Sequence, residues 1–165
     1  MHALFYDHSI TRDGKIFDPD GRVLPQNNFN GYAGVWIGKR NYYVHRLLAH
    51  VFVPNPAPKL LHLVDHIDRD KKNNAISNLR WVNHAINGLN TDAKNAYYVK
   101  KWKKWQARVC GKSLGYYKTF EKAHEVSKAY RSKLLETIYN QTCAKTDDSY
   151  SNSFEETRRY PTLVS

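Results

Sequence analysis

Alternating apolar and polar positions, broken by turn residues, mark the first 44 residues of the chain. The segments 31–38 and 41–44 alternate as the two strands of a hairpin do. The stretches 11–14 and 18–21 both end in Asp-Gly, a pair that accepts the positive φ of a tight turn. This part of the sequence predicts short strands joined by hairpin turns.

A helical period begins at His45. The apolar residues within 47–52 fall on one face of a short helix. Pro54 and Pro56 follow, and proline ends a helix because it lacks a backbone donor. We therefore expect one short helix and then a rigid, extended connector.

The central part of the chain predicts a hairpin followed by a second helix. Residues 64–67 and 79–82 have strand patterns, and the polar turn 69–74 lies between them. Asn83 suits an N-cap, because its side-chain oxygen accepts hydrogen bonds from the free amides of the first turn. The helix is expected to run to about Asn90.

The C-terminal part predicts a small sheet and one long helix. The strand-like pieces are residues 97–101, 104–110 and 114–118, with a turn at 111–113. Thr119 caps an amphipathic helix that is expected to end near Cys143. The remaining residues are polar and are expected to be loosely ordered.

Together these patterns predict an α+β protein with three segments. Residues 1–93 form a β-rich portion and the hairpin–helix unit, residues 94–143 form a basic domain of three strands and a helix, and residues 144–165 form a polar, flexible tail.

Positive charge is concentrated in the C-terminal part. The chain has 26 Lys and Arg against 15 Asp and Glu, a net charge of +11. Twelve of these cations and only two glutamates lie between Lys94 and Lys133, so this segment carries +10. Such a segment favours a polyanion, and its interleaved Trp and Tyr residues favour stacking on bases. The alternative is a solvated, solubilising surface.

Composition argues against several other classes of protein. No apolar run approaches the length of a membrane span, and the N-terminus lacks the apolar core of a signal peptide. Cys110 and Cys143 lie far apart, which indicates neither a disulfide framework nor a zinc knuckle. We therefore expect an intracellular, cytoplasmic protein without a membrane or small-molecule partner.

Four polar residues of the central part have the chemistry of phosphodiester hydrolysis: Asp65, His66, Asn78 and Asn87. Histidine suits a general base because its ordinary pKa lies close to neutral pH. Asp65 and Asn87 offer only oxygen ligands, which favours one Mg²⁺ or Mn²⁺ ion over zinc. The hairpin and helix are expected to place His66 and Asn87 across a small cleft. Asp65 faces away from His66 in a regular strand, so a shared site needs a strand end or a twist.

Each of these residues also has a simpler interpretation. A single histidine in a strand is usually a packed or surface residue. Asn78 also suits a turn, and Asn87 also suits a solvated helix position. The spacing of all four within one strand–turn–helix unit favours the functional interpretation.

The same part of the chain resembles the HNH endonucleases, in particular the phage-type homing enzymes. The likeness is carried by VHRLLA at 44–49, FVPNP at 52–56, DHID at 65–68, KNN at 72–74 and NLRWV at 78–82. It implies a ββα-metal module in which His66 is the general base and Asp65 and Asn87 hold the metal. Asn78 would brace the hairpin and orient His66. A phage-encoded protein of this kind would act in an infected host cell.

The sequence departs from the family pattern in two places. Asn87 stands where the family name expects a histidine, and His84, three residues earlier, is a rival ligand. The turn reads Asp68-Arg69-Asp70, whereas many relatives carry glycine after the first Asp. His62 is expected to be structural or to contact a phosphate.

Residues 95–135 resemble a second family, the ethylene-response-factor type of DNA-binding domain. The likeness is carried by KWQARV at 104–109, LGYY at 114–117 and TFEKA at 119–123. It implies a three-stranded sheet, backed by one helix, that enters the major groove of DNA. Across both domains, the residues expected to contact DNA are Arg69, Lys71, Lys72, Arg80, Lys101, Lys103, Lys104, Trp105, Arg108, Lys112 and Lys118. The alternative is a basic domain that only steadies the nuclease.

The sequence as a whole predicts a metal-dependent, site-specific endonuclease that nicks or cuts double-stranded DNA. One catalytic unit suits a monomer that nicks one strand, and a weak homodimer is the other possibility. A different class of function is a DNA-binding regulator with an inert HNH-like unit. A nuclease that acts on RNA or in restriction is a third interpretation.

Overall fold

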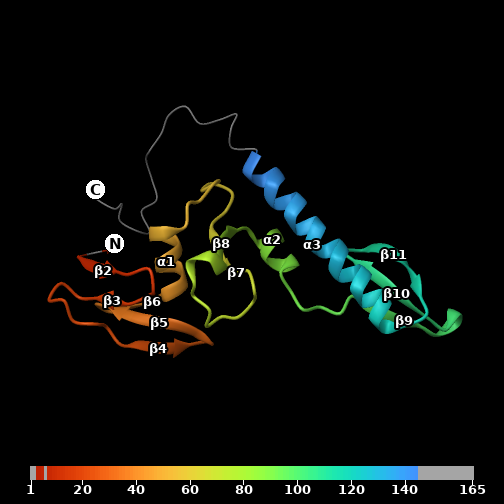
Figure 1. The fold of residues 1–165 in the computed structure, drawn as a ribbon, viewed down its shortest axis with the longest axis horizontal. Coiled ribbons are helices and arrows are strands. Elements are labelled where there is room, and N and C mark those ends of the chain that lie inside the picture. The colour runs from red at the N-terminus through yellow and green to blue at the C-terminus, as the bar shows by residue number, and fades with distance from the viewer. Residues whose placement is uncertain (1–2, 6, 145–165) are drawn as a thin grey trace. The chain divides into compact units, whose positions relative to one another are not determined.

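The computed structural model describes residues 3–5 and 7–144, which divide into two compact units (Figure 1). The first unit ends at Asn83 and the second begins at His84. The predicted functional domains meet instead at residues 93 and 94, and that boundary stays a prediction. The predicted tail lies outside the described residues, apart from Ala144.

Two small antiparallel sheets form the N-terminal half of the first unit. Their strands are β1 (Ala3–Phe5), β2 (His8–Ile10), β3 (Ile16–Phe17), β4 (Gln26–Phe29), β5 (Tyr32–Ile37) and β6 (Arg40–Tyr43). The sheet orders are β1-β2-β3 and β4-β5-β6. The predicted hairpin of β5 and β6 is confirmed. The polar strand β4 was missed, since its sequence QNNF has no apolar alternation and all four residues are exposed.

The helix α1 (Val44–Phe52) joins this half to the hairpin of β7 (Leu63–His66) and β8 (Leu79–Val82). Its buried face packs against β5, β6, β7 and β8. The Trp81 indole donates a hydrogen bond of 2.9 Å to the carbonyl of Val53, just beyond the helix. These contacts fix the positions of α1 and of the hairpin within the first unit. The order of the elements, a helix and then a hairpin, is the order that the sequence predicted.

An apolar core cluster joins the sheets, α1 and β8 in the first unit. Its buried members include residues of β2, β3, β5, α1 and β8: Ile10, Ile16, Val35, Val44, Leu47, Leu48 and Leu79. Each large aliphatic side chain buried in this way contributes roughly 1.5–3 kcal/mol to stability. The core thus holds the end of β7 against the start of α1.

The second unit contains α2 (His84–Leu89), a three-stranded antiparallel sheet and the long helix α3 (Phe120–Ala144). The strands are β9 (Ala96–Val99), β10 (Lys104–Val109) and β11 (Lys112–Tyr117), with β10 in the centre. The helix α3 packs on this sheet through Ala96, Ala107 and Ala123 (Figure 1). The sheet and helix agree with the prediction, and Thr119 Oγ1 accepts a hydrogen bond from the amide of Lys122 as an N-cap.

The turn between β10 and β11 is shorter than the predicted 111–113. It consists of Cys110 and Gly111, both with positive φ (49° and 82°). Two positive φ values are the mark of the two-residue turn that matches strand twist. Lys112 therefore belongs to β11.

Arg69, in the turn after β7, adopts a φ of +70°. This is the position at which the sequence lacks the glycine of many relatives. A side chain in this region costs about 1 kcal/mol, because its Cβ crowds the backbone. The turn forms despite that cost, since Arg69 N donates to the carbonyl of His66 at 3.0 Å.

We expect the Arg69→Gly variant to be more stable than the Arg69→Ala variant by about 1 kcal/mol, because both lack the side chain and only alanine keeps the Cβ. Urea unfolding of the two proteins measures this difference. Equal stability would contradict a strained backbone at this position.

Candidate active site

His66 is the last residue of β7 and is buried, with 4% of its surface exposed. Its Nε2 lies 3.0 Å from Oδ1 of Asn74. An amide oxygen can only accept a hydrogen bond, so this contact requires the proton on Nε2. The neutral imidazole then carries its lone pair on Nδ1, which is the basic nitrogen.

The His66 ring belongs to a cluster of rings drawn from four elements. It lies 4.9 Å from the ring of His45 and 6.0 Å from the ring of Tyr32, with which it is stacked. The His45 ring also contacts Tyr32 at 5.0 Å and Tyr43 at 5.5 Å. Strand β5, the start of α1 and the end of β7 thus fix the His66 ring from several sides.

His45 is itself buried, and its Nδ1 makes no hydrogen bond within the described part of the chain. Burial, with smaller contributions from the charges of His66 and Arg46, lowers the pKa of His45 to about 3. His45 is therefore neutral at ordinary pH and packs beside His66 without adding charge.

Asp65 lies on the other side of β7 and pairs with Arg80 on β8. Asp65 Oδ2 accepts hydrogen bonds from Arg80 Nε at 3.1 Å and from Nη2 at 2.8 Å. The two residues are directly opposite in the strand register, and their side chains are only 10% and 17% exposed. The carboxylate is thus held in one orientation by a partly buried cation.

The loop between β7 and β8 is organised by Asp68. Its carboxylate accepts hydrogen bonds from the amides of Asn73 (2.7 Å) and Asn78 (2.8 Å) and from the backbone N–H of Asp70 (2.8 Å). These hydrogen bonds hold the pKa of Asp68 below its usual value. Asn78 Oδ1 in turn accepts from the backbone N–H of Asp68 at 3.0 Å.

Asn78 therefore ties the two ends of the loop together. The structure places it where it braces the hairpin, and Asn74, within the braced loop, contacts His66 directly. The sequence missed the part played by Asn74, Tyr32 and His45. Asn74 lies in the Lys-Asn-Asn run, but nothing in that run tells which asparagine reaches the imidazole.

Asn87 and the rival ligand His84 lie on α2, in the second unit. Both are exposed, while Ile86 and Leu89 are buried, and α2 packs against α3. Asp65 and His66 belong to the first unit. The predicted cleft between His66 and Asn87, and the choice between Asn87 and His84, stay predictions.

The donor set suits a hard cation. Among the described residues, no group of three or more His, Cys, Asp and Glu side chains has the arrangement of a metal site. Asp65 offers a carboxylate and Asn87 an amide oxygen, the donor types that Mg²⁺ and Mn²⁺ prefer. Since the two residues belong to different units, a shared ion stays a prediction.

The predicted DNA-contacting residues differ in their surroundings. Most are exposed cations: Arg69, Lys71, Lys72, Lys101, Lys103, Lys104, Arg108, Lys112 and Lys118. Arg80 instead pairs with Asp65. Trp105 is half-buried. Its ring centroid lies 5.1 Å from that of Phe120, edge to face, and the side chain packs on the Ala96–Ala107–Ala123 cluster. We therefore assign Trp105 to the core of the second unit and Arg80 to the support of Asp65.

Comparison with known proteins identifies the central segment. Residues 42–89 match the family described as HNH endonuclease. The chain carries an HNH endonuclease domain. This domain includes α1, the β7–β8 hairpin and α2, and hence His45, Asp65, His66 and Asn74.

Three relatives extend the likeness beyond the HNH domain. Two uncharacterized HNH endonucleases of Acanthamoeba polyphaga mimivirus are 34% and 36% identical over 106 and 87 residues. These alignments cover 60% and 46% of this chain but only 32% and 22% of the relatives. The DNA endonuclease I-HmuI of Bacillus phage SP01 is 31% identical over 100 residues, which cover 57% of this chain and 56% of I-HmuI.

A solved structure described as "DNA binding and cleavage by the HNH homing endonuclease I-HmuI" is also similar. It has a TM-score of 0.43 and 29% identity, and covers 58% of this chain and 57% of that chain. The chain thus spans about half of I-HmuI or less than a third of the mimiviral relatives. No helix among residues 3–5 and 7–144 is long and apolar enough to cross a membrane.

We expect acid to destabilise the protein through His45. The pKa of His45 is about 3 in the folded chain and about 6.5 in the unfolded chain. Below pH 6.5 the unfolded chain therefore binds a proton that the folded chain does not, and the free energy of unfolding falls as the pH falls. The loss is about 1.4 kcal/mol per pH unit, or about 2 kcal/mol by pH 5. The His45→Phe variant should lack this component, which urea unfolding at pH 7.5, 6 and 5 measures. Equal pH dependence in both proteins would contradict a buried, neutral His45.

Proposed function

We propose that the HNH domain is a metal-dependent endonuclease that hydrolyses one phosphodiester bond of double-stranded DNA. The observation that carries this proposal is the His66 imidazole, buried at the end of β7 with Nε2 engaged by Asn74. The HNH family match and the printed name of the phage relative, a DNA endonuclease, support the same chemistry.

His66 acts as the general base. With its proton on Nε2, it accepts the proton of the attacking water on Nδ1. Asn74 keeps Nε2 as the donor, and the Asp68–Asn78 network keeps Asn74 in place. The rings of His45 and Tyr32 hold the imidazole plane, so the base is oriented before DNA binds.

Asp65 and Asn87 are the proposed ligands of one Mg²⁺ or Mn²⁺ ion. When bound, the ion would stabilise negative charge on the scissile phosphate and on the departing 3′ oxygen. Arg80 supports the site by holding the Asp65 carboxylate in a single orientation. The Arg80 guanidinium also lowers the cost of burying the Asp65 charge.

The second unit is proposed to hold the duplex in the manner of an ethylene-response-factor domain. The face of the sheet away from α3 carries Tyr97, Gln106 and Tyr116, which are neighbours in the strand register. Gln106 Nε2 donates to Tyr116 Oη at 3.1 Å, and the exposed Arg108 follows on β10. Planar, polar and cationic side chains on one exposed face suit DNA, with a steep dependence of affinity on salt.

A second candidate function is a DNA-binding regulator in which the HNH domain is inert. The observation that favours it is the basic second unit, which would bind DNA without any catalytic residue. The two functions share their DNA partner and differ only in whether the bound DNA is cut. The form of the cleaved plasmid, nicked circle or linear, distinguishes nicking from double-strand cleavage.

The decisive prediction concerns His66. We expect the wild-type protein to nick supercoiled plasmid with Mg²⁺ and not with chelator, and the His66→Ala variant to be slower by about 10²–10⁴-fold, because the attacking water loses its base. Its DNA affinity in a gel shift should stay within about threefold of wild type, since the substitution leaves the basic surface unchanged. The matched control is His62→Ala, an exposed histidine just before β7, which should retain nicking. A wild-type protein that shifts DNA without nicking it at any metal concentration would favour the regulator.

A second prediction distinguishes the two candidate metal ligands. Asn87→Ala should lower the nicking rate and weaken Mn²⁺ binding by about 10-fold or more, because the ion loses an oxygen ligand. His84→Ala should leave both nearly unchanged. Calorimetric titration with Mn²⁺ and the nicking rate measure the two effects. The reverse pattern would assign the ligand to His84.

A further inference from the structure

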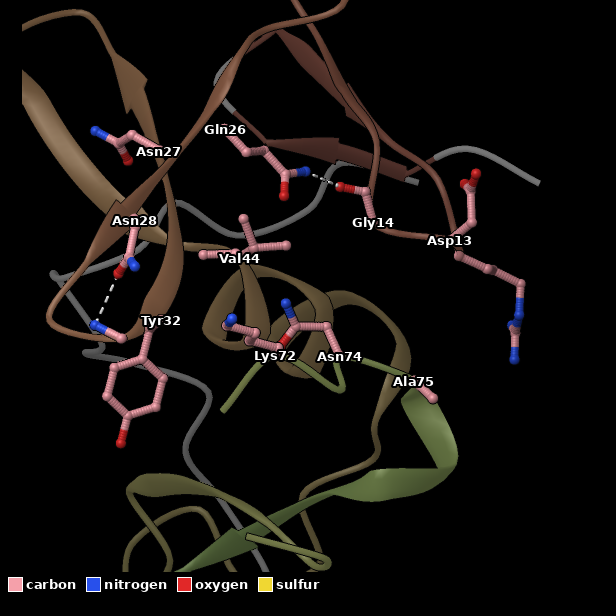
Figure 2. A pocket seen from close by; sticks show the side chains of 13 residues that line it. Asp13, Gly14, Gln26, Asn27, Asn28, Tyr32, Val44, Lys72, Asn74 and Ala75 are labelled. Atoms are coloured by element: carbon pink, nitrogen blue, oxygen red, sulfur yellow. Dashed lines mark hydrogen bonds between the residues drawn. The ribbon is translucent and has the colours of Figure 1, made fainter. Parts of the chain in front are cut away.

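A pocket lined by polar and apolar groups lies in the first unit (Figure 2). Its volume is about 550 Å³, within the range of roughly 300–1,000 Å³ that small-molecule sites occupy. Tyr32 and Asn74 line the pocket, and the same two residues contact the His66 ring. The pocket therefore adjoins the proposed general base.

Four amide side chains line the pocket, and three of them, Gln26, Asn28 and Asn74, are each held at one end. Gln26 Nε2 donates to the carbonyl of Gly14 at 2.7 Å, and Asn28 Oδ1 accepts from the N–H of Gly31 at 2.8 Å (Figure 2). Asn74 Oδ1 is held by His66. Their other ends, Gln26 Oε1 and the Nδ2 atoms of Asn28 and Asn74, make no hydrogen bond within the described ranges of the chain. The lining thus offers one acceptor and two donor groups that are already oriented.

Asn27, between the two β4 amides, is different. With its amide turned to the orientation that satisfies both atoms, the nitrogen donates to the carbonyl of Gly34 at 2.8 Å and the oxygen accepts from the Trp36 indole at 3.1 Å. Both ends of Asn27 are used inside the β4–β6 sheet. Because alternate residues of β4 face opposite sides, Gln26 and Asn28 differ from Asn27, and each uses only one end of its amide in the hydrogen bonds described above.

Cations complete the lining. Arg12 and Lys72 border the pocket, and the one acidic residue of the lining, Asp13, lies 3.3 Å from Lys15 in an ion pair. An anionic group is therefore favoured. Figure 2 shows Lys72 and Asn74 on the loop side, with Gln26 and Asn28 reaching from β4. The pocket combines contacts for a phosphate with contacts for the donors and acceptors of a base.

We propose that this pocket receives one nucleotide of the DNA strand next to the scissile bond and that Asn28 and Gln26 read its base. The inference rests on the proposed function, because it takes the His66 site as the place of cleavage. Asparagine and glutamine amides recognise base edges through paired donors and acceptors. Lys72 and Arg12 contact the phosphate of the same nucleotide, which positions it without reading sequence.

Asn28→Asp tests the proposal with the least change of structure. The aspartate keeps the oxygen that accepts from Gly31 N and replaces the Nδ2 donor with an acceptor. Its negative charge weakens DNA binding in general, so the matched control is Asn30→Asp, which adds the same charge two residues later, just after β4 and outside the pocket lining. Asn30 has a φ of +54°, which aspartate also tolerates. Gln26→Met, nearly isosteric, is a second variant that adds no charge.

The experiment uses the full chain and a library of duplexes with randomised sequence in the presence of Mg²⁺. The bound DNA and the nicked DNA are sequenced separately. We expect Asn28→Asp and Gln26→Met to change the base preference at a single position beside the nick, by roughly tenfold, the effect of one lost hydrogen bond. Asn30→Asp should lower binding at all sequences and leave every base preference as in the wild type.

Two failures are distinguishable. Wild-type protein that binds the library without nicking it contradicts the proposed function, and the bound fraction still reports the base preferences. If Asn28→Asp and Gln26→Met show the same preferences as Asn30→Asp at every position, the pocket does not read a base. Thermal unfolding of each variant checks that the fold is retained.

Discussion

The hydrogen bond between His66 Nε2 and Asn74 Oδ1 is the contact on which the proposed chemistry depends. It determines which nitrogen of the imidazole is basic, and it joins the strand that carries the base to the loop that follows it. The bond persists because both partners are held elsewhere: His66 by the rings of His45 and Tyr32, and Asn74 by a loop closed around Asp68. A general base oriented before substrate arrives avoids a cost of ordering during the reaction.

Strand β7 also separates the ion pair of Asp65 and Arg80 from the imidazole rings. The Asp65 carboxylate pairs with Arg80 on one side of β7, and the imidazoles of His66 and of the neutral His45 lie on the other. The Asp65 carboxylate and the His66 imidazole therefore lie on opposite faces of one strand, because successive side chains of a strand face opposite directions. Arg80 therefore holds the Asp65 carboxylate, and the His66 imidazole lies apart from that ion pair. The proposed roles of Asp65 and His66 draw on these two separate surroundings.

Much of the architecture followed from local patterns. The change from strand to helical period at His45, the prolines after Phe52 and the cap at Thr119 predicted element order to within a few residues. Strand β4 was missed, and the turn before β11 begins one residue earlier than predicted. Strand β4 is polar and is paired with β5, and the turn depends on a positive φ at Cys110 that its residue type does not announce. The DNA contact of Trp105 stays a prediction, and the structure adds that its ring lies against Phe120.

The sequence by itself determined the fold class, the hairpin–helix order and the residues Asp65, His66, Asn78 and Asn87 as candidates, because these depend on short-range spacing and side-chain chemistry. Only the tertiary structure decided that Arg80 serves Asp65, that Asn74 orients His66 and that His45 and Tyr32 enclose its ring. Tyr32 and His66 are 34 positions apart in the chain and His45 stands on another element, so no local pattern links them. Burial in a common core brings them together, and the pocket beside them exists for the same reason.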